Sequence, residues 1–156
     1  MVMRDTSDAF WENWHPFGLA ILHLIVVSLI TFFTDYRITN SLFDESKLWS
    51  PFFTLAAGAG GILFSVFVFM MAPAAGFVEK ISKLAIFEKF KGFVKNALFF
   101  TALGVASTLP LIMADESQYD QLWYVWNAII ASSVLVAMTL SIIRVLRIFM
   151  IWASAD

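Results

Sequence analysis

The sequence contains no cysteine, and only 14% of its 156 residues are charged. The absence of cysteine excludes disulfides, thiolate metal sites and cysteine nucleophiles. A soluble domain carries about a quarter of its residues as charges, so the low charge and the 60% hydrophobic content indicate a surface that faces lipid. The formal net charge of −2 provides no basic surplus for binding nucleic acid.

What the sequence does contain is four long apolar runs, and each is long enough to cross about 30 Å of hydrocarbon. They cover residues 16–34, 51–72, 93–113 and 122–143. Backbone polar groups in lipid must pair within their own segment, so the runs are expected to be helices. We predict an all-α integral membrane protein, a bundle of four transmembrane helices that forms one domain over residues 1–156. Pro16 and Pro51 are expected in the first turns of their helices, where proline is tolerated. The first run is too long for a cleavable signal peptide and is expected to remain in the mature protein.

The tryptophans support these boundaries. Five lie at or just before the start of a predicted span, Trp11, Trp14, Trp49, Trp123 and Trp126, and Trp152 closes the apolar stretch that continues past the fourth span. Tryptophan is enriched where a membrane meets water, so this distribution is typical of an aromatic belt.

The basic residues predict the orientation. Eight of the ten fall on one side of the predicted membrane: Arg4, Lys80, Lys83, Lys89, Lys91, Lys95, Arg144 and Arg147. Only Arg37 and Lys47 fall on the other side. By the positive-inside rule, this side is expected to be cytoplasmic, with both termini inside.

The link between the second and third spans carries two similar amphipathic blocks, residues 77–85 and 86–94. A shift of nine residues turns a helical face by about half a circle, so a bend is expected near Ala85. Two interpretations remain open, contact with the lipid surface and docking of a cytoplasmic protein partner. The candidate contact residues are Lys80, Lys83, Phe87, Lys89, Phe90 and Lys91.

Motifs for catalysis are missing. All Lys, Arg, Asp and Glu residues fall outside the apolar runs or at their ends, although ion-coupled pumps usually keep such a group at membrane depth. The sequence has no HExxH motif, no GxSG-type serine motif and no aspartate pair within a span. The only histidines, His15 and His23, both belong to the region of the first span, which disfavours a haem within one chain. We therefore predict no enzymatic activity, no cofactor and no metal.

Two helical faces are candidates for function. His23, Ser28, Thr31 and Asp35 share one half of the first span. This half is expected either to pack against neighbouring spans, with His23 bonded to a carbonyl, or to line a water-filled pore. In the second span, Thr54, Gly58, Gly61 and Ser65 form a narrow face of small residues. Membrane helices approach closely at such faces, so it should contact another span or a second copy.

These features together resemble small four-span proteins of bacterial anti-phage systems, such as RexB-like proteins and the membrane subunit of Kiwa systems. The likeness lies in the chain length, the face from Thr54 to Ser65, the lysine-rich link 78–95 and the absence of catalytic motifs. The resemblance implies a channel-like or sensing component of the bacterial inner membrane that acts with a cytoplasmic partner. We expect a non-enzymatic homo-oligomer in the lipid bilayer that perturbs membrane permeability or anchors and regulates a cytoplasmic partner in anti-phage defence. The alternative is an accessory subunit of a larger respiratory or transport complex.

Overall fold

The computed structural model describes residues 6–34, 46–71, 85–119 and 121–153. In these ranges the chain forms four long helices: α1 (Thr6–Phe33), α3 (Ser46–Met71), α5 (Ala85–Ile112) and α6 (Leu122–Ala153). A short 3-10 turn, η1 (Glu116–Gln118), lies between α5 and α6. Each of the four helices contains a stretch that is long and apolar enough to cross a membrane. The prediction of an all-helical chain with four helices long and apolar enough to cross a membrane is therefore confirmed.

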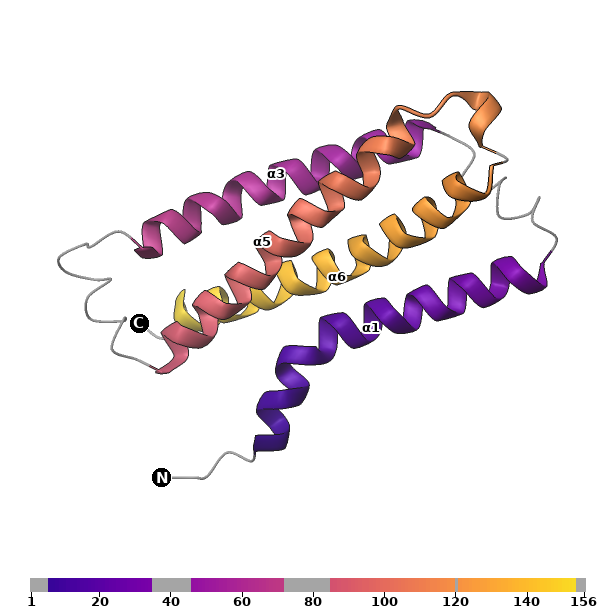
Figure 1. Ribbon diagram of the computed structural model, residues 1–156. Helices are drawn as coiled ribbons and strands as arrows, with labels where there is room; N and C mark the ends of the chain where they lie inside the picture. Colours follow the sequence, from indigo (N-terminus) through magenta and orange to yellow (C-terminus); the bar gives the residue numbers. More distant parts are fainter. Residues whose placement is uncertain (1–5, 35–45, 72–84, 120, 154–156) are drawn as a thin grey trace.

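The helices extend beyond the predicted spans. The stretches that are able to cross a membrane are Trp14–Phe33, Leu48–Met71, Phe87–Ile112 and Leu122–Met150. Because α1 begins at Thr6 and α3 at Ser46, both Pro16 and Pro51 lie inside helices, and their expected place in the first turn is wrong. Proline removes a backbone hydrogen bond and kinks a helix. Figure 1 shows α1 changing direction in its N-terminal part, where Pro16 lies.

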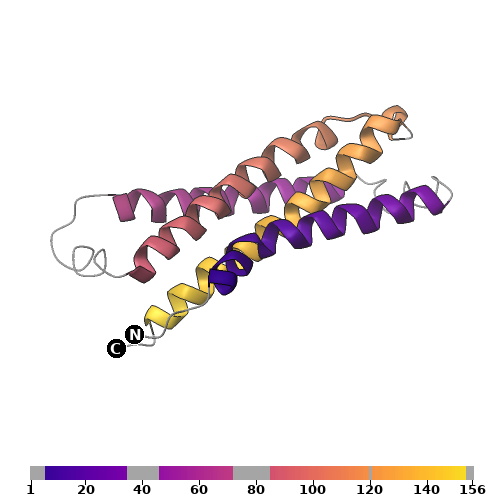
Figure 2. The same cartoon turned by 60° about the horizontal axis from the view of Figure 1, so that its bottom comes forward.

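The helices run alternately up and down and are arranged as an open row. α5 packs against both α3 and α6, and α6 also packs against α1, whereas α3 and α6 touch only slightly. The order across the row is therefore α3, α5, α6, α1 (Figure 1). The view in Figure 2 shows α1 beside α6, on the side away from α3. Unlike in a closed four-helix bundle, α1 and α3 form two edges.

Small residues let α3 and α5 approach each other closely. A Cβ atom built on Gly60 of α3 would lie 3.3 Å from Oγ1 of Thr101, and one on Gly104 of α5 would lie 3.4 Å from Cβ of Ala56. The same Cβ on Gly104 would lie 3.5 Å from Sδ of Met138 on α6. Small side chains at these positions let three helices meet, which is how packing is achieved in lipid.

The first turns of α5 are packed into the protein core. Phe87, Phe90 and Val94 are buried together with Leu63 and Met70 of α3. Residues 86–94 therefore begin the helix that continues into the third span, and they form no separate element at a bend. The prediction that Phe87 and Phe90 lie on a surface is wrong, because α3 and α6 cover them. The first amphipathic block, with Lys80 and Lys83, lies outside the described residues.

At the end of the helices opposite to Phe87 and Phe90, an aromatic cluster joins α3 to α6. Trp49 of α3 is only 2% exposed, and its Nε1 donates a hydrogen bond of 3.2 Å to the hydroxyl of Tyr124 on α6. The rings of Tyr119 and Tyr124 lie 4.9 Å apart, centroid to centroid. Trp14, Trp123 and Trp126 are exposed, as residues of an aromatic belt are. Trp49 instead holds α3 to α6.

Candidate functional site

The small-residue face of α3 points away from the rest of the chain. Thr54, Gly58, Gly61 and Ser65 are all exposed. A Cβ atom built on Gly58 or Gly61 would meet no atom within 4 Å. The hydroxyl of Thr54 donates to the carbonyl of Ser50 at 2.9 Å, and that of Ser65 to the carbonyl of Gly61 at 3.0 Å. These hydroxyls are thus paired within α3, as lipid or a closely packed partner requires.

The helix that carries this face has a second small face, which is used within the chain. Ala56 and Gly60 lie against α5. At about 100° per residue, the direction of Gly58 is about 200° from that of Ala56. The two faces therefore lie on opposite sides of α3. The sequence predicts that the outward face contacts either another span or a second copy. Within the described part of the chain, this face contacts no other span.

The polar half of α1 faces α6. Ser28 and Thr31 are half-buried, and the hydroxyl of Thr31 donates to the carbonyl of Val27 at 2.8 Å. The opposite side of α1, which includes Ile25 and Leu29, is exposed. Asp35 lies outside the described residues. The structure thus places the described members of the candidate pore-lining set against a neighbouring helix, and a role in lining a pore stays a prediction.

His23 is joined to α6 through a serine. Its Nδ1 lies 3.1 Å from Oγ of Ser133, whose hydroxyl is also 2.9 Å from the carbonyl oxygen of Ile129. The partner is therefore a hydroxyl group and not the carbonyl that we expected. Ser133 was missed by sequence reasoning, because its position in an apolar helix does not indicate which helix lies beside it.

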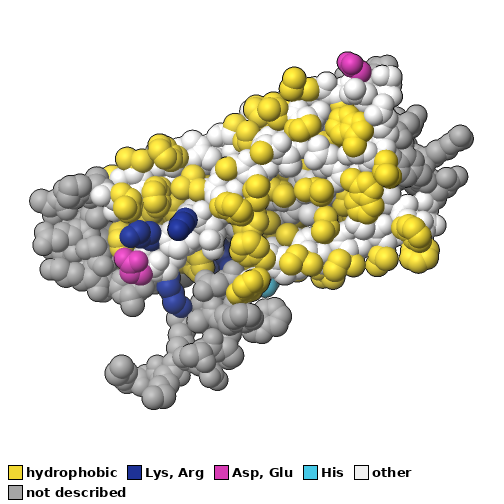
Figure 3. Space-filling view, viewed as in Figure 1, with side chains coloured by type: hydrophobic (Ala, Val, Ile, Leu, Met, Phe, Trp, Pro, Cys, Tyr) yellow, Lys and Arg dark blue, Asp and Glu magenta, His cyan; other side chains and the backbone are white. Residues whose placement is uncertain are grey.

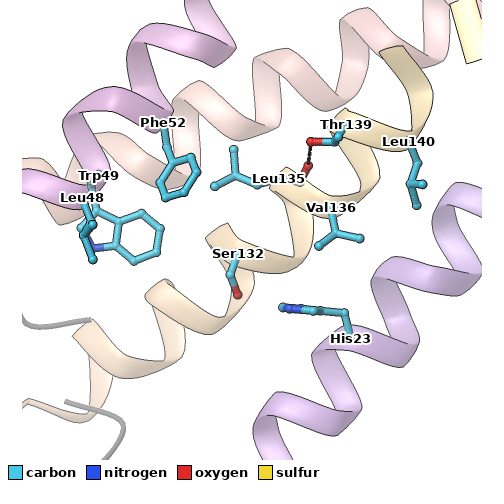
Figure 4. Close-up of a pocket in the computed structure, with 9 residues that line it drawn as sticks. All are labelled: His23, Leu48, Trp49, Phe52, Ser132, Leu135, Val136, Thr139 and Leu140. Atoms are coloured by element: carbon cyan, nitrogen blue, oxygen red, sulfur yellow. Dashed lines mark hydrogen bonds between the residues drawn. The ribbon is translucent and has the colours of Figure 1, made fainter. Parts of the chain in front are cut away.

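His23 also borders a cleft with a volume of about 460 Å³. Figure 4 shows its ring extending towards α6, and the side chains around the cleft come from α1, α3 and α6. The cleft is lined by His23, Leu48, Trp49, Phe52, Ser132, Leu135, Val136, Thr139 and Leu140. Its volume lies in the range of small-molecule sites, which are mostly apolar with a few polar groups. The sequence did not predict this cleft, because it depends on the spacing between α1 and α3.

Most of the described charged side chains lie at one end of the molecule, where the acidic Glu88 accompanies the basic residues. Lys89, Lys91 and Lys95 lie near the start of α5, and Arg144 of α6 lies over the ring of Phe93, 5.6 Å from its centroid. Figure 3 shows blue side chains gathered at this end of the molecule. Asp115 lies beyond the other end of α5. Of the candidate contact residues, Lys89 is exposed and Lys91 half-buried, so the basic end offers charge without the aromatic anchors.

The described residues contain no group of three or more His, Cys, Asp or Glu that could hold a metal ion. Comparisons with protein-family models, curated proteins and solved structures found no match. The functional argument therefore depends on the geometry of the small-residue face, the cleft and the basic end.

Proposed function

We propose that the chain is a non-enzymatic protein of the bacterial inner membrane that self-associates through α3 and alters membrane permeability. The observation that carries the proposal is the outward face of Thr54, Gly58, Gly61 and Ser65, which has no partner within the described chain. Such faces drive association between membrane helices, since they allow backbones to approach closely. A role in anti-phage defence is supported by the resemblance alone.

The proposal is tested by adding bulk to the outward face. Gly58→Leu and Gly61→Leu put a branched side chain into space that is open within one chain, so each copy should still fold. Between two copies the same side chain would hold the backbones apart. We expect association to weaken at least tenfold, which corresponds to about 1.4 kcal/mol. The measurement is oligomer size in mild detergent by light scattering.

A matched control is Ala102→Leu, which adds bulk to an exposed small residue on α5. This variant should assemble like the parent. Phe67 of α3 is unsuitable as a lipid-facing control, because it packs against the core. If both glycine variants assemble like the parent, the outward face is not an interface between copies. Recovery only within a large multi-subunit complex would favour the accessory-subunit alternative.

A second role, anchoring a cytoplasmic partner, is favoured by the basic end of the molecule. Lys89 and Arg147 are exposed there, and both belong to the side that the positive-inside rule assigns to the cytoplasm. Because Phe87 and Phe90 are buried, the attraction would be mainly electrostatic. Such attraction is expected to weaken as salt is raised.

The orientation can be tested with single cysteines, since the chain has none of its own. Ser117 in η1 is exposed, so Ser117→Cys should react with an impermeant thiol reagent in intact cells. Ser82→Cys, in the link between the second and third spans, should react only after permeabilisation. The opposite labelling pattern would place the termini outside the cell.

A further inference from the structure

The cleft beside His23 lies within the membrane-spanning part of the chain. His23 is the tenth of the twenty residues from Trp14 to Phe33, so it lies near the middle of the bilayer. Leu48 begins the candidate span of α3 and borders the same cleft. Along α6 the cleft extends from Ser132 to Leu140, which is about 12 Å at 1.5 Å per residue. The cleft therefore runs from one membrane boundary towards the bilayer centre.

Most polar groups at the cleft are already paired within α6. The hydroxyl of Ser132 donates to the carbonyl of Ile129 at 2.8 Å, and that of Thr139 to the carbonyl of Leu135 at 2.8 Å. A hydroxyl in an apolar helix has no better acceptor than the carbonyl of the preceding turn. These side chains therefore provide no free donor to a bound molecule.

His23 differs from them because one of its nitrogens remains available. The hydroxyl of Ser133 donates its only proton to the carbonyl of Ile129 at 2.9 Å, so it has none left for Nδ1 of His23. We therefore assign to His23 the tautomer in which Nδ1–H donates to the serine oxygen at 3.1 Å. In neutral imidazole the other nitrogen, Nε2, is then an acceptor. No group in the described residues pairs with Nε2, and His23 lines the cleft.

We propose that the cleft binds a long-chain or isoprenoid alcohol whose hydroxyl donates a hydrogen bond to Nε2 of His23. Trp49, Phe52 and Val136 would contact its apolar body. In hydrocarbon an unpaired hydroxyl is costly, as is an unpaired acceptor, and one hydrogen bond satisfies both groups. An ordinary acyl chain would fill the cleft but leave Nε2 without a partner.

The test uses the full-length protein in lipid nanodiscs. A hexadecanol probe with a diazirine near the hydroxyl is photocrosslinked, and labelled residues are mapped by mass spectrometry. Labelling should fall on α1, α3 and α6 around the cleft. Unlabelled hexadecanol should compete about fivefold better than hexadecyl methyl ether, which has the same chain but no donor. This comparison on the parent protein requires no variant to fold.

Two variants locate the interaction. His23→Phe keeps a ring but removes the acceptor, so alcohol and ether should compete equally. Val136→Trp narrows the cleft and should abolish its labelling, whereas Ile130→Trp, at an exposed position on the same helix, should not. Equal competition by ether and alcohol on the parent would overturn the proposal, as would cleft labelling that persists in Val136→Trp.

The chain type is resolved by comparing geranylgeraniol with hexadecanol as competitors, and stronger competition by either supports the proposal. Because the cleft is formed within one chain, Gly61→Leu should bind the probe like the parent. Loss of self-association and loss of the alcohol site are therefore separate results.

Discussion

Gly104→Leu is expected to disrupt the packing of three helices and to cause one of the largest losses of stability in the chain. Gly104 lies where α5 meets Ala56 of α3 and Met138 and Leu135 of α6. A leucine side chain has no space among these atoms, and overpacking a core costs about 3 kcal/mol in severe cases. The measurement is unfolding by a denaturing detergent, followed by circular dichroism.

The control for this prediction is Gly104→Ala. A single Cβ would lie 3.4 to 4.0 Å from its neighbours, which is ordinary contact. Alanine also favours a helix interior over glycine by about 1 kcal/mol, so this variant should be as stable as the parent or more stable. If Gly104→Leu unfolds like the parent, the close approach of α3, α5 and α6 at this glycine is contradicted.

Phe90→Ala is the second substitution with a large expected effect. Phe90 is 3% exposed and belongs to the buried cluster that joins the start of α5 to α3 and α6. Removing its ring leaves a cavity and deletes contacts on all sides, at a cost of about 3 kcal/mol. We expect a lower unfolding midpoint in detergent, together with reduced recovery of folded protein.

The matched control lies on the same helix. Phe99 is 54% exposed, so in Phe99→Ala lipid or detergent can occupy the vacated space. Its effect should be below about 1 kcal/mol. A stable Phe90→Ala variant that merely fails to recover a soluble partner would show instead that Phe90 belongs to a docking surface.

The sequence was sufficient to predict the four long apolar helices that the described residues form. In hydrocarbon, backbone polar groups must pair within their own segment, so a long apolar segment forms a helix and its composition alone predicts the local structure. The helix starts were harder to predict. The first turns of α5 are held by Phe87 and Phe90, which find partners on α3 and α6, and a pattern within one segment does not contain those partners.

The arrangement of the helices could not be predicted from periodicity. α3 has small residues on two opposite sides, and only the structure shows that Ala56 and Gly60 face α5 while Gly58 and Gly61 face outward. Likewise, Trp49 has the sequence position of a belt residue, but its burial depends on Tyr124, which is 75 residues away. Lipid is as apolar as the interior of a membrane protein, so hydrophobicity does not show which apolar side chains are buried and which face lipid.

The open row has a consequence for symmetry. An isologous contact, in which the outward face of α3 meets its own copy about a two-fold axis along the membrane normal, uses that face completely and closes at two subunits. Both α1 helices would then lie at the far edges of a row of eight. Growth beyond a dimer would require a heterologous contact between different surfaces, and α1, whose exposed side carries Ile25 and Leu29, is the remaining edge. Whether assembly stops at two copies or continues into a ring thus depends on α1, the edge opposite to Gly58 and Gly61 of α3.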